Sequence, residues 1–167
     1  MILFESIYSR NKELFKEIYF HHYYKSGLFL LLEIIIGISL LANLLSLIFF
    51  GSEPYYYTFA YIIFILLVQF WGYHRMVKIS VEREKEISTN GAVIYTISVL
   101  EDKIIQKTSL GSEYVIDFSN IKRAYKTSNY IALQSNARQL YILKRKGFTV
   151  GDEETFFVFL RNKGYKI

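Results

Sequence analysis

Cysteine is absent from this 167-residue sequence, proline occurs once and glycine nine times. Without cysteine, the sequence contains no disulfide bond, thiolate nucleophile or cysteine-ligated metal. The low proline and glycine content excludes collagen-like and proline-rich linker classes. Charged residues are also scarce at 21%, whereas 52% of the residues are hydrophobic and 18% are aromatic. This composition is too apolar for a disordered protein, and the length allows one or two small units.

Two long apolar stretches lie in the first half of the chain. Residues 28–50 contain a single charge, Glu33, and residues 55–73 contain none. A bilayer core roughly 30 Å thick needs about 20 apolar residues of helix, so both stretches are long enough to span it. Only residues 51–54 separate them, and their glycine and proline predict a tight turn. We therefore expect a two-helix transmembrane hairpin over residues 28–74. Two buried helices of a soluble core are disfavoured, because the rest of the chain is too short to cover them.

Basic residues flank the predicted hairpin on both sides, whereas its connection carries none. They are Arg10, Lys12, Lys16, Lys25, Arg75, Lys78, Arg83 and Lys85. Because cytoplasmic flanks are enriched in Lys and Arg, both termini of this multi-pass protein are predicted to be cytoplasmic. Aromatic residues at both predicted interfaces match the expected belt. Those on the inner side are Tyr23, Tyr24, Trp71 and Tyr73, and those on the outer side are Tyr55, Tyr56 and Tyr57.

Polar side chains interrupt both spans. Glu33 and Gln69 are expected at similar depth in antiparallel spans, where a hydrogen bond between them, joined by His74, would satisfy both. Asn43 lies on a polar stripe with two serines at helical spacing, which permits packing against the second span or another copy of the protein. Structural contacts are the favoured interpretation. The alternative is an oligomeric small transporter or channel component that uses Glu33, Asn43 and Gln69.

The first 27 residues, 1–27, are predicted to form a cytoplasmic strand and an amphipathic helix. Residues 2–8 alternate enough for a short strand, and Ser9 or Asn11 can cap the helix that follows. The apolar face of that helix either lies in the membrane interface or extends the first span. It consists of Leu14, Phe15, Ile18, Tyr19 and Phe20. The sequence leaves open whether the short strand joins the sheet predicted in the C-terminal part.

Residues 75–167 are predicted to form a cytosolic α+β unit. Val77, Ile79 and Val81 alternate with polar residues, a period typical of a strand. Further strands are predicted at 92–100, 104–109, 113–118, 121–126, 130–134 and 139–143. Asp152 is suited to cap a closing helix that ends at Gly164. This order favours a small curved antiparallel sheet or barrel with one open end covered by the helix, the architecture of a pleckstrin-homology-like domain.

The run YILKRKGF follows the two spans and the predicted strands. With Ile142, Lys144, Arg145 and Phe148 matching an I-x-K-[KR]-x-x-F feature, the chain resembles the YcxB-like proteins, small bacterial membrane proteins with a C-terminal pleckstrin-homology-like domain. Many relatives have proline before the first lysine, where this chain has Leu143. The resemblance covers most of the chain. It implies the fold and a location in the bacterial cell membrane, and it implies no catalytic residue.

No metal-ligand spacing, phosphate-binding glycine loop or nucleophile elbow occurs in the sequence. The three histidines lie beside the predicted spans, so a nucleophile in residues 75–167 would lack its usual base. No catalytic residue, metal or cofactor is therefore predicted. We expect a protein that acts by binding and not by catalysis.

The excess of basic residues in the C-terminal part indicates the kind of ligand that it binds. From Arg75 onward the sequence has sixteen basic and ten acidic residues. The predicted binding residues are Lys122, Arg123, Lys126, Lys144, Arg145 and Lys146. On a domain tethered to a bilayer, they can engage anionic phospholipid headgroups of the inner leaflet. The alternative is a protein partner or a second copy that docks on a sheet edge or groove, with Tyr125, Tyr130 and Tyr141 as candidate contacts. Nucleic acid is not a predicted partner, because the enrichment of Lys and Arg on the cytoplasmic side of membrane proteins explains the positive charge equally well.

Overall fold

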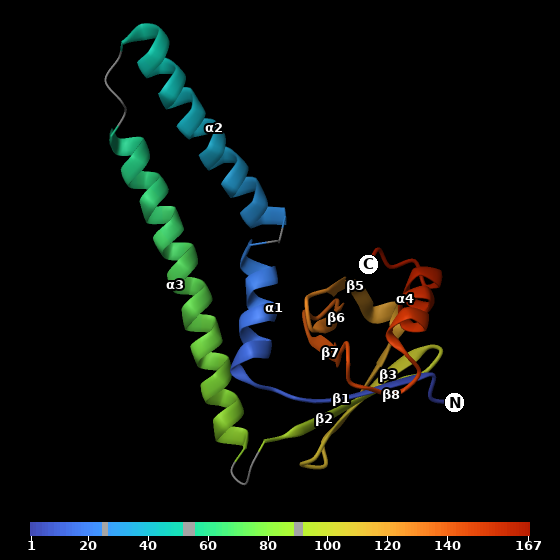
Figure 1. The fold of residues 1–167 in the computed structure, drawn as a ribbon. Coiled ribbons are helices and arrows are strands. Elements are labelled where there is room, and N and C mark those ends of the chain that lie inside the picture. Colours follow the sequence, from blue (N-terminus) through green and yellow to red (C-terminus); the bar gives the residue numbers. More distant parts are fainter. Residues whose placement is uncertain (25–26, 52–55, 89–91) are drawn as a thin grey trace. The chain divides into compact units, whose positions relative to one another are not determined.

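The computed structural model describes residues 1–24, 27–51, 56–88 and 92–167 (Figure 1). Its contacts divide the chain into a sheet unit, residues 1–18 and 81–167, and a helical unit, residues 19–80. The sequence placed the boundaries after residues 27 and 74 instead. The predicted turn at 52–54, Lys25 and Tyr55 lie outside the described residues, as do the side chains of Tyr23 and Tyr57.

The helical unit contains the two apolar stretches as long helices. These are α2 (Gly27–Phe50) and α3 (Tyr56–Ile87), and α3 continues into the sheet unit from residue 81. Segments Phe29–Phe49 and Thr58–Ile87 are long and apolar enough to cross a membrane. Because their apolar side chains are largely exposed, these helices indicate that the chain associates with a membrane.

The strand predicted around Val77, Ile79 and Val81 is wrong, since these residues continue helix α3. Val77 and Val81 are one helical turn apart and are less exposed than Lys78 and Glu82. An alternation of only five residues also satisfies an i, i+4 pattern, so it cannot distinguish a strand from a helix.

The described residues of the sheet unit contain eight antiparallel strands in two sheets. The first sheet has the order β4-β3-β2-β1-β8, and the second has the order β5-β6-β7. Their bounds are β1 (Phe4–Ser9), β2 (Ile94–Val99), β3 (Lys103–Thr108), β4 (Glu113–Asp117), β5 (Ile121–Lys126), β6 (Tyr130–Ser135), β7 (Leu140–Lys144) and β8 (Phe148–Val150). The N-terminal strand therefore joins the C-terminal sheet as an inner strand, paired with β2 from Phe4↔Val99 to Ser9↔Ile94.

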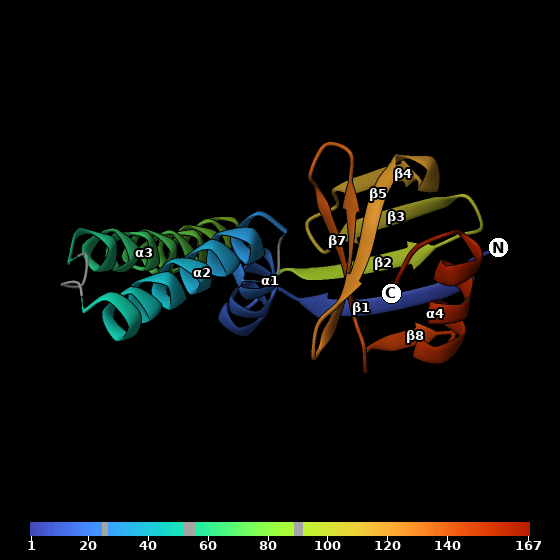
Figure 2. The same ribbon diagram turned by 90° about the horizontal axis from the view of Figure 1, so that it is seen from above.

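The predicted alternative of a closed barrel does not form among the described residues. The chain leaves the first sheet after β4 and enters the second at β5 through a short 3-10 turn, Phe118–Asn120, without a ladder between the two strands. Figure 2 shows the second sheet crossing over the first. One link between the sheets is Ser6, whose hydroxyl oxygen accepts from the Lys144 amide at 2.9 Å. Apolar side chains between the two sheets form the core.

Helix α4 (Glu153–Asn162) closes one end of this core, as the sequence predicted for the last helix. Asp152 caps it by accepting hydrogen bonds from the amides of Glu154 and Thr155, both at 2.9 Å. Phe156 is fully buried, with its ring 5.0 Å from that of Phe4. The acids of the first turn also favour this helix start through its partial positive charge.

Helix α1 (Lys12–Tyr24) begins in the sheet unit and ends in the helical unit. Asn11 caps it as predicted, because its side-chain oxygen accepts from the Leu14 amide at 2.8 Å. The apolar face was predicted to meet the membrane or extend the first span. Its first half does neither, since Leu14 and Ile18 are buried in the core of the sheet unit.

Candidate functional site

The six predicted basic residues all lie on or just after strands of the second sheet. Lys122, Arg123 and Lys126 belong to β5, whereas Lys144 ends β7 and the other two follow it. Strand β6 lies between β5 and β7 and separates the two groups of basic residues. The strand register nevertheless brings Lys126 and Lys144 to the same end, because Lys126 pairs with Ile131 and Lys144 pairs with Tyr130.

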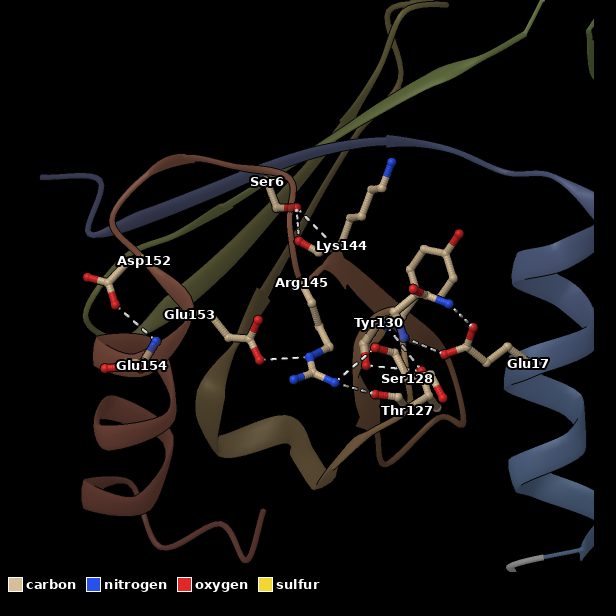
Figure 3. Close-up of polar contacts among 11 residues, drawn as sticks. Ser6, Glu17, Thr127, Ser128, Tyr130, Lys144, Arg145, Asp152, Glu153 and Glu154 are labelled. Carbon is tan, nitrogen blue, oxygen red and sulfur yellow. Dashed lines mark hydrogen bonds and ion pairs between the residues drawn. The ribbon is translucent and has the colours of Figure 1, made fainter.

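Arg145 is held by the protein itself. Its Nε donates to Glu153 Oε1 at 2.7 Å, and its Nη1 donates to the carbonyls of Thr127 and Ser128 at 3.1 and 2.9 Å (Figure 3). These bonds join the β5–β6 turn to the start of α4. Arg145 therefore acts as a structural clamp, and its role as a headgroup ligand stays a prediction.

The other basic side chains are exposed. Arg123 donates to Gln134 and lies 5.7 Å from the Tyr125 ring. Lys126 lies 5.5 Å from the Phe157 ring. Exposed Lys126, Lys144 and Lys146 together define what we call the basic end of the second sheet. Of the aromatic contacts predicted for a partner, Tyr130 and Tyr141 are buried in the core and Tyr125 is half-buried.

One acid lies beside the basic end. Glu17 of α1 accepts from the backbone amide of Asn129 at 2.7 Å and from its side-chain amide at 2.9 Å. Burial acts to raise the pKa of Glu17, but hydrogen bonds from Thr127 and Asn129 outweigh it and hold the pKa below its ordinary value. Glu17 therefore stays ionised and ties α1 to the β5–β6 turn.

The predicted intramembrane residues differ in their surroundings. Glu33 is exposed on α2, whereas Gln69 on α3 is only 6% exposed, so they do not form a shared buried pair. The side-chain amide of Asn43 donates to the Ser39 carbonyl of its own helix at 2.9 Å. His74 Nδ1 makes its hydrogen bond with the Phe70 carbonyl one turn earlier. These hydrogen bonds of Asn43 and His74 lie within single helices, and the oligomeric channel stays a prediction.

An open pocket lies at the end of the first sheet that α4 does not cover. We call it the open-end pocket, and its volume is about 380 Å³. The antiparallel register brings its walls together, because Tyr95 pairs with Thr108 and Gln106 pairs with Tyr114. Lining residues are Arg10, Ile87, Val93, Tyr95, Gln106, Thr108, Leu110, Ser112, Tyr114, Gln139, Leu140 and Tyr141. Its size falls within the range of small-ligand sites.

A buried polar network forms one wall of this pocket. The Arg10 guanidinium lies 4.1 Å from the centre of the Tyr95 ring, and Nη1 lies 3.8 Å from Glu84 Oε2. The Tyr95 hydroxyl donates to Glu84 Oε1 at 3.0 Å, and its ring stacks on Tyr8 at 5.5 Å. Burial and the Glu84 charge raise the pKa of Tyr95 to about 12 against the opposing effect of Arg10. This network joins the last turns of α3 to strands β1 and β2.

Gln106 offers the pocket a side-chain amide that no described protein group pairs with. Its side chain lies on the inward face of β3 with Ile104, is 8% exposed, and makes no hydrogen bond within the described residues. Sequence reasoning missed this residue. The signal was present, because Gln106 stands two residues after Ile104, where a period of two requires an apolar side chain.

No family model, curated protein or solved structure matches this chain. Among the residues that the structure describes, no three His, Asp or Glu side chains are grouped so that they could hold a metal ion. The basic end and the open-end pocket therefore have to be interpreted from their own chemistry.

Proposed function

We propose that this chain is a two-span protein of the bacterial cell membrane with both termini in the cytoplasm. Its sheet unit is a non-catalytic binding module of pleckstrin-homology-like architecture that engages anionic phospholipid headgroups of the inner leaflet. The observation that carries this proposal is the gathering of exposed Lys126, Lys144 and Lys146 at one end of the second sheet.

Chain length supports contact between the basic end and the bilayer. Glu17 binds Asn129 in the turn next to Lys126, and Gly27, where α2 begins, lies ten positions after Glu17 in the sequence. Ten residues reach about 35 Å when extended and about 15 Å when helical. The basic end is thus tethered close enough to reach the headgroups of the leaflet, where each lysine contributes roughly 1 kcal/mol of attraction.

Fold and sequence support the family part of the proposal. Two antiparallel sheets with a C-terminal helix at one end are compatible with a pleckstrin-homology-like unit. Residues 142–148 carry the YcxB-like feature, and Lys144 and Arg145 of that feature lie at or beside the basic end. Membership of the YcxB-like family belongs to the same proposal.

The test uses the full chain in nanodiscs, because β1 is an inner strand and a fragment starting at residue 75 would lack it. Lysine acylation is compared in discs of neutral phosphatidylcholine and in discs that also contain phosphatidylglycerol. We expect Lys126, Lys144 and Lys146 to be labelled roughly fivefold more slowly in the anionic discs, which corresponds to about 1 kcal/mol per lysine. The protection should disappear in about 1 M salt, where the screening length falls to about 3 Å.

Lys103 on β3 is the internal control, because it is exposed on the other sheet. Equal labelling of the three lysines in both kinds of disc would overturn the proposal. Protection of Lys103 to the same extent would also overturn it, since that result reports a general surface potential and not contact through the basic end.

A second candidate is a protein partner at the edge of the first sheet. Strand β4 ends the strand order, so its outer edge carries no paired strand within the described residues. Tyr114 and Val115 on this strand are more than half exposed. An edge strand with exposed apolar side chains can accept an extended peptide from a partner.

A photo-crosslinking residue at Val115 in native membranes tests the second candidate, with Glu154 on α4 as a matched exposed control position. Adducts that form at Val115 and not at Glu154 would support it, and their mass would separate a second copy from another protein. Recovery of the uncrosslinked chain alone would count against it.

A further inference from the structure

The open-end pocket contains a hydrogen-bonding group that the fold leaves unused. Gln106 carries two N–H donors and a carbonyl acceptor, and all of them lack partners within the described residues. The buried side-chain atoms without a partner among the described residues are Tyr8 Oη and Arg10 Nε, so the Gln106 amide reaches solvent through the open pocket. A ligand that enters the pocket can replace this solvent and accept from the amide.

Arg10 is the one charged residue among the lining residues, and no acid lines the pocket within the described part of the chain. Glu84 pairs with Arg10 from α3 at 3.8 Å and also accepts the Tyr95 hydroxyl at 3.0 and 3.2 Å, so it offsets part of the guanidinium charge. Arg10 Nε remains buried without a hydrogen-bond partner among the described residues. The pocket therefore offers a surplus of donors next to a guanidinium group.

Further donors and apolar walls surround this point. The Gln139 oxygen accepts from the Tyr141 hydroxyl at 3.2 Å, which leaves the Gln139 amino group available. Leu110 and Ile87 line the pocket and are about half exposed. A ligand that buries these side chains gains about 25 cal/mol for each Å² of apolar surface removed from water. Donors on one side and apolar side chains on the other favour an amphiphilic ligand.

We propose that the open-end pocket binds a carboxylate attached to an apolar body. The carboxylate accepts from the Gln106 amide and is attracted by Arg10, and the apolar body packs on Leu110 and Ile87. The carboxylate can belong to a free small acid or to the C-terminal residue of a peptide. The pocket shares no residue with the basic end, so this inference and the proposed lipid contact can fail independently.

The experiment titrates the full chain in nanodiscs with 4-phenylbutanoate and follows the side-chain amide signals of ¹⁵N-labelled glutamine. We expect the Gln106 and Gln139 signals to shift in a saturable way with a Kd of about 1 mM or tighter, as suits a small ligand. Gln134 is the internal control, because it lies outside the pocket and binds Arg123. The matched alcohol, 4-phenylbutanol, should produce a much weaker shift.

Two peptide arms distinguish the source of the carboxylate. A tripeptide Gly-Gly-Phe with a free C-terminus that binds more tightly than phenylbutanoate identifies a peptide terminus, and the reverse order identifies a small acid. The amidated tripeptide should not bind. Equal shifts from acid and alcohol, equal shifts at Gln106 and Gln134, or no shift up to about 10 mM of any probe would overturn the proposal.

A substitution separates binding from stability. Gln106→Leu keeps the size of the side chain and removes its amide, so affinity measured at Gln139 should fall about tenfold or more. The thermal midpoint should stay constant or rise, because leucine places apolar surface on the inward face of β3. Gln134→Leu is the matched control and should leave affinity unchanged. Unchanged affinity in Gln106→Leu, together with a lower midpoint, would show that Gln106 is structural and overturn the proposal.

Discussion

The two ends of the first sheet differ in how far they are covered from solvent. At the closed end, where Phe4 pairs with Val99, helix α4 covers the core with Phe156 and Phe159. At the open end, where Tyr8 pairs with Tyr95, polar side chains surround a pocket. Burial of apolar area stabilises the closed end, whereas the open end contains groups that the fold leaves unsatisfied. An open end with a pocket of this size is typical of a binding site.

The largest expected effect comes from breaking the closed end. Phe156→Ala removes a fully buried ring between Phe4 and Phe148. Because the cavity cannot collapse fully, the free energy of unfolding of the sheet unit should fall by about 3–5 kcal/mol. Hydrogen exchange of the strand amides in the full chain measures this change. The control, Val158→Ala on the exposed face of the same helix, should cost well under 1 kcal/mol, and equal losses would contradict the packing argument.

The link between the sheets, midway between the two ends, gives the next effect. Ser6 is fully buried, and its hydroxyl pairs with the Lys144 amide and carbonyl (Figure 3). Ser6→Ala leaves the Lys144 amide without that partner, so the free energy of unfolding should fall by about 1–2 kcal/mol. Ser9→Ala, at the exposed end of the same strand, is the control. Faster exchange confined to β1 and β7 would confirm that the bond joins the sheets, and unchanged exchange there would refute it.

High pH should destabilise the open end more than the closed end. The pKa of Tyr95 is raised to about 12, above the ordinary value of 10.0, so the unfolded chain loses this proton first as the pH rises. The contribution of protonated Tyr95 to the free energy of unfolding is therefore fully present below pH 10. It is lost between pH 10 and 12, and the loss is on the order of 1 kcal/mol after solvent screening. Tyr95→Phe should flatten this decline in a denaturation series against pH. The exposed Tyr114→Phe is the control, and an unchanged slope in Tyr95→Phe would contradict the assignment.

The smallest effect concerns the helix cap beside the open end. Asn11→Ala removes the acceptor of the Leu14 amide and should lower the free energy of unfolding by about 1 kcal/mol. Asn11→Ser restores a cap and should recover most of that loss. Hydrogen exchange in the first turn of α1 reports the change, and equal exchange in both variants would show that the cap contributes nothing.

Elements with strong local signals were predicted correctly. The strands from β2 to β7 are short runs of strand-forming residues bounded by turn residues, and Asp152 caps α4 as expected. The short strand β8 was missed because three residues cannot show a period. Val77 and Val81 misled the prediction because their spacing fits both strand and helix.

The candidate sites depend more than the fold on contacts between residues that are distant in the sequence. Sequence reasoning placed Arg145 with the headgroup ligands, and its hydrogen bonds to Glu153 and Thr127 form only after the β5–β6 turn packs against α4. Gln106 was overlooked because one polar residue in a strand has many explanations. Its meaning depends on burial and on missing partners, which are properties of the packed unit.

By itself, the sequence determined two apolar helices long enough for a membrane, the strand-rich C-terminal part and the capped last helix. These follow from local periodicity, composition and capping, which act over a few residues. Only the tertiary structure decided that β1 pairs with β2 across more than eighty intervening residues, that the strands form two sheets and no barrel, and that Arg10, Glu84, Tyr95 and Gln106 meet at one end. Such contacts depend on which distant surfaces complement one another, and no local pattern records that choice.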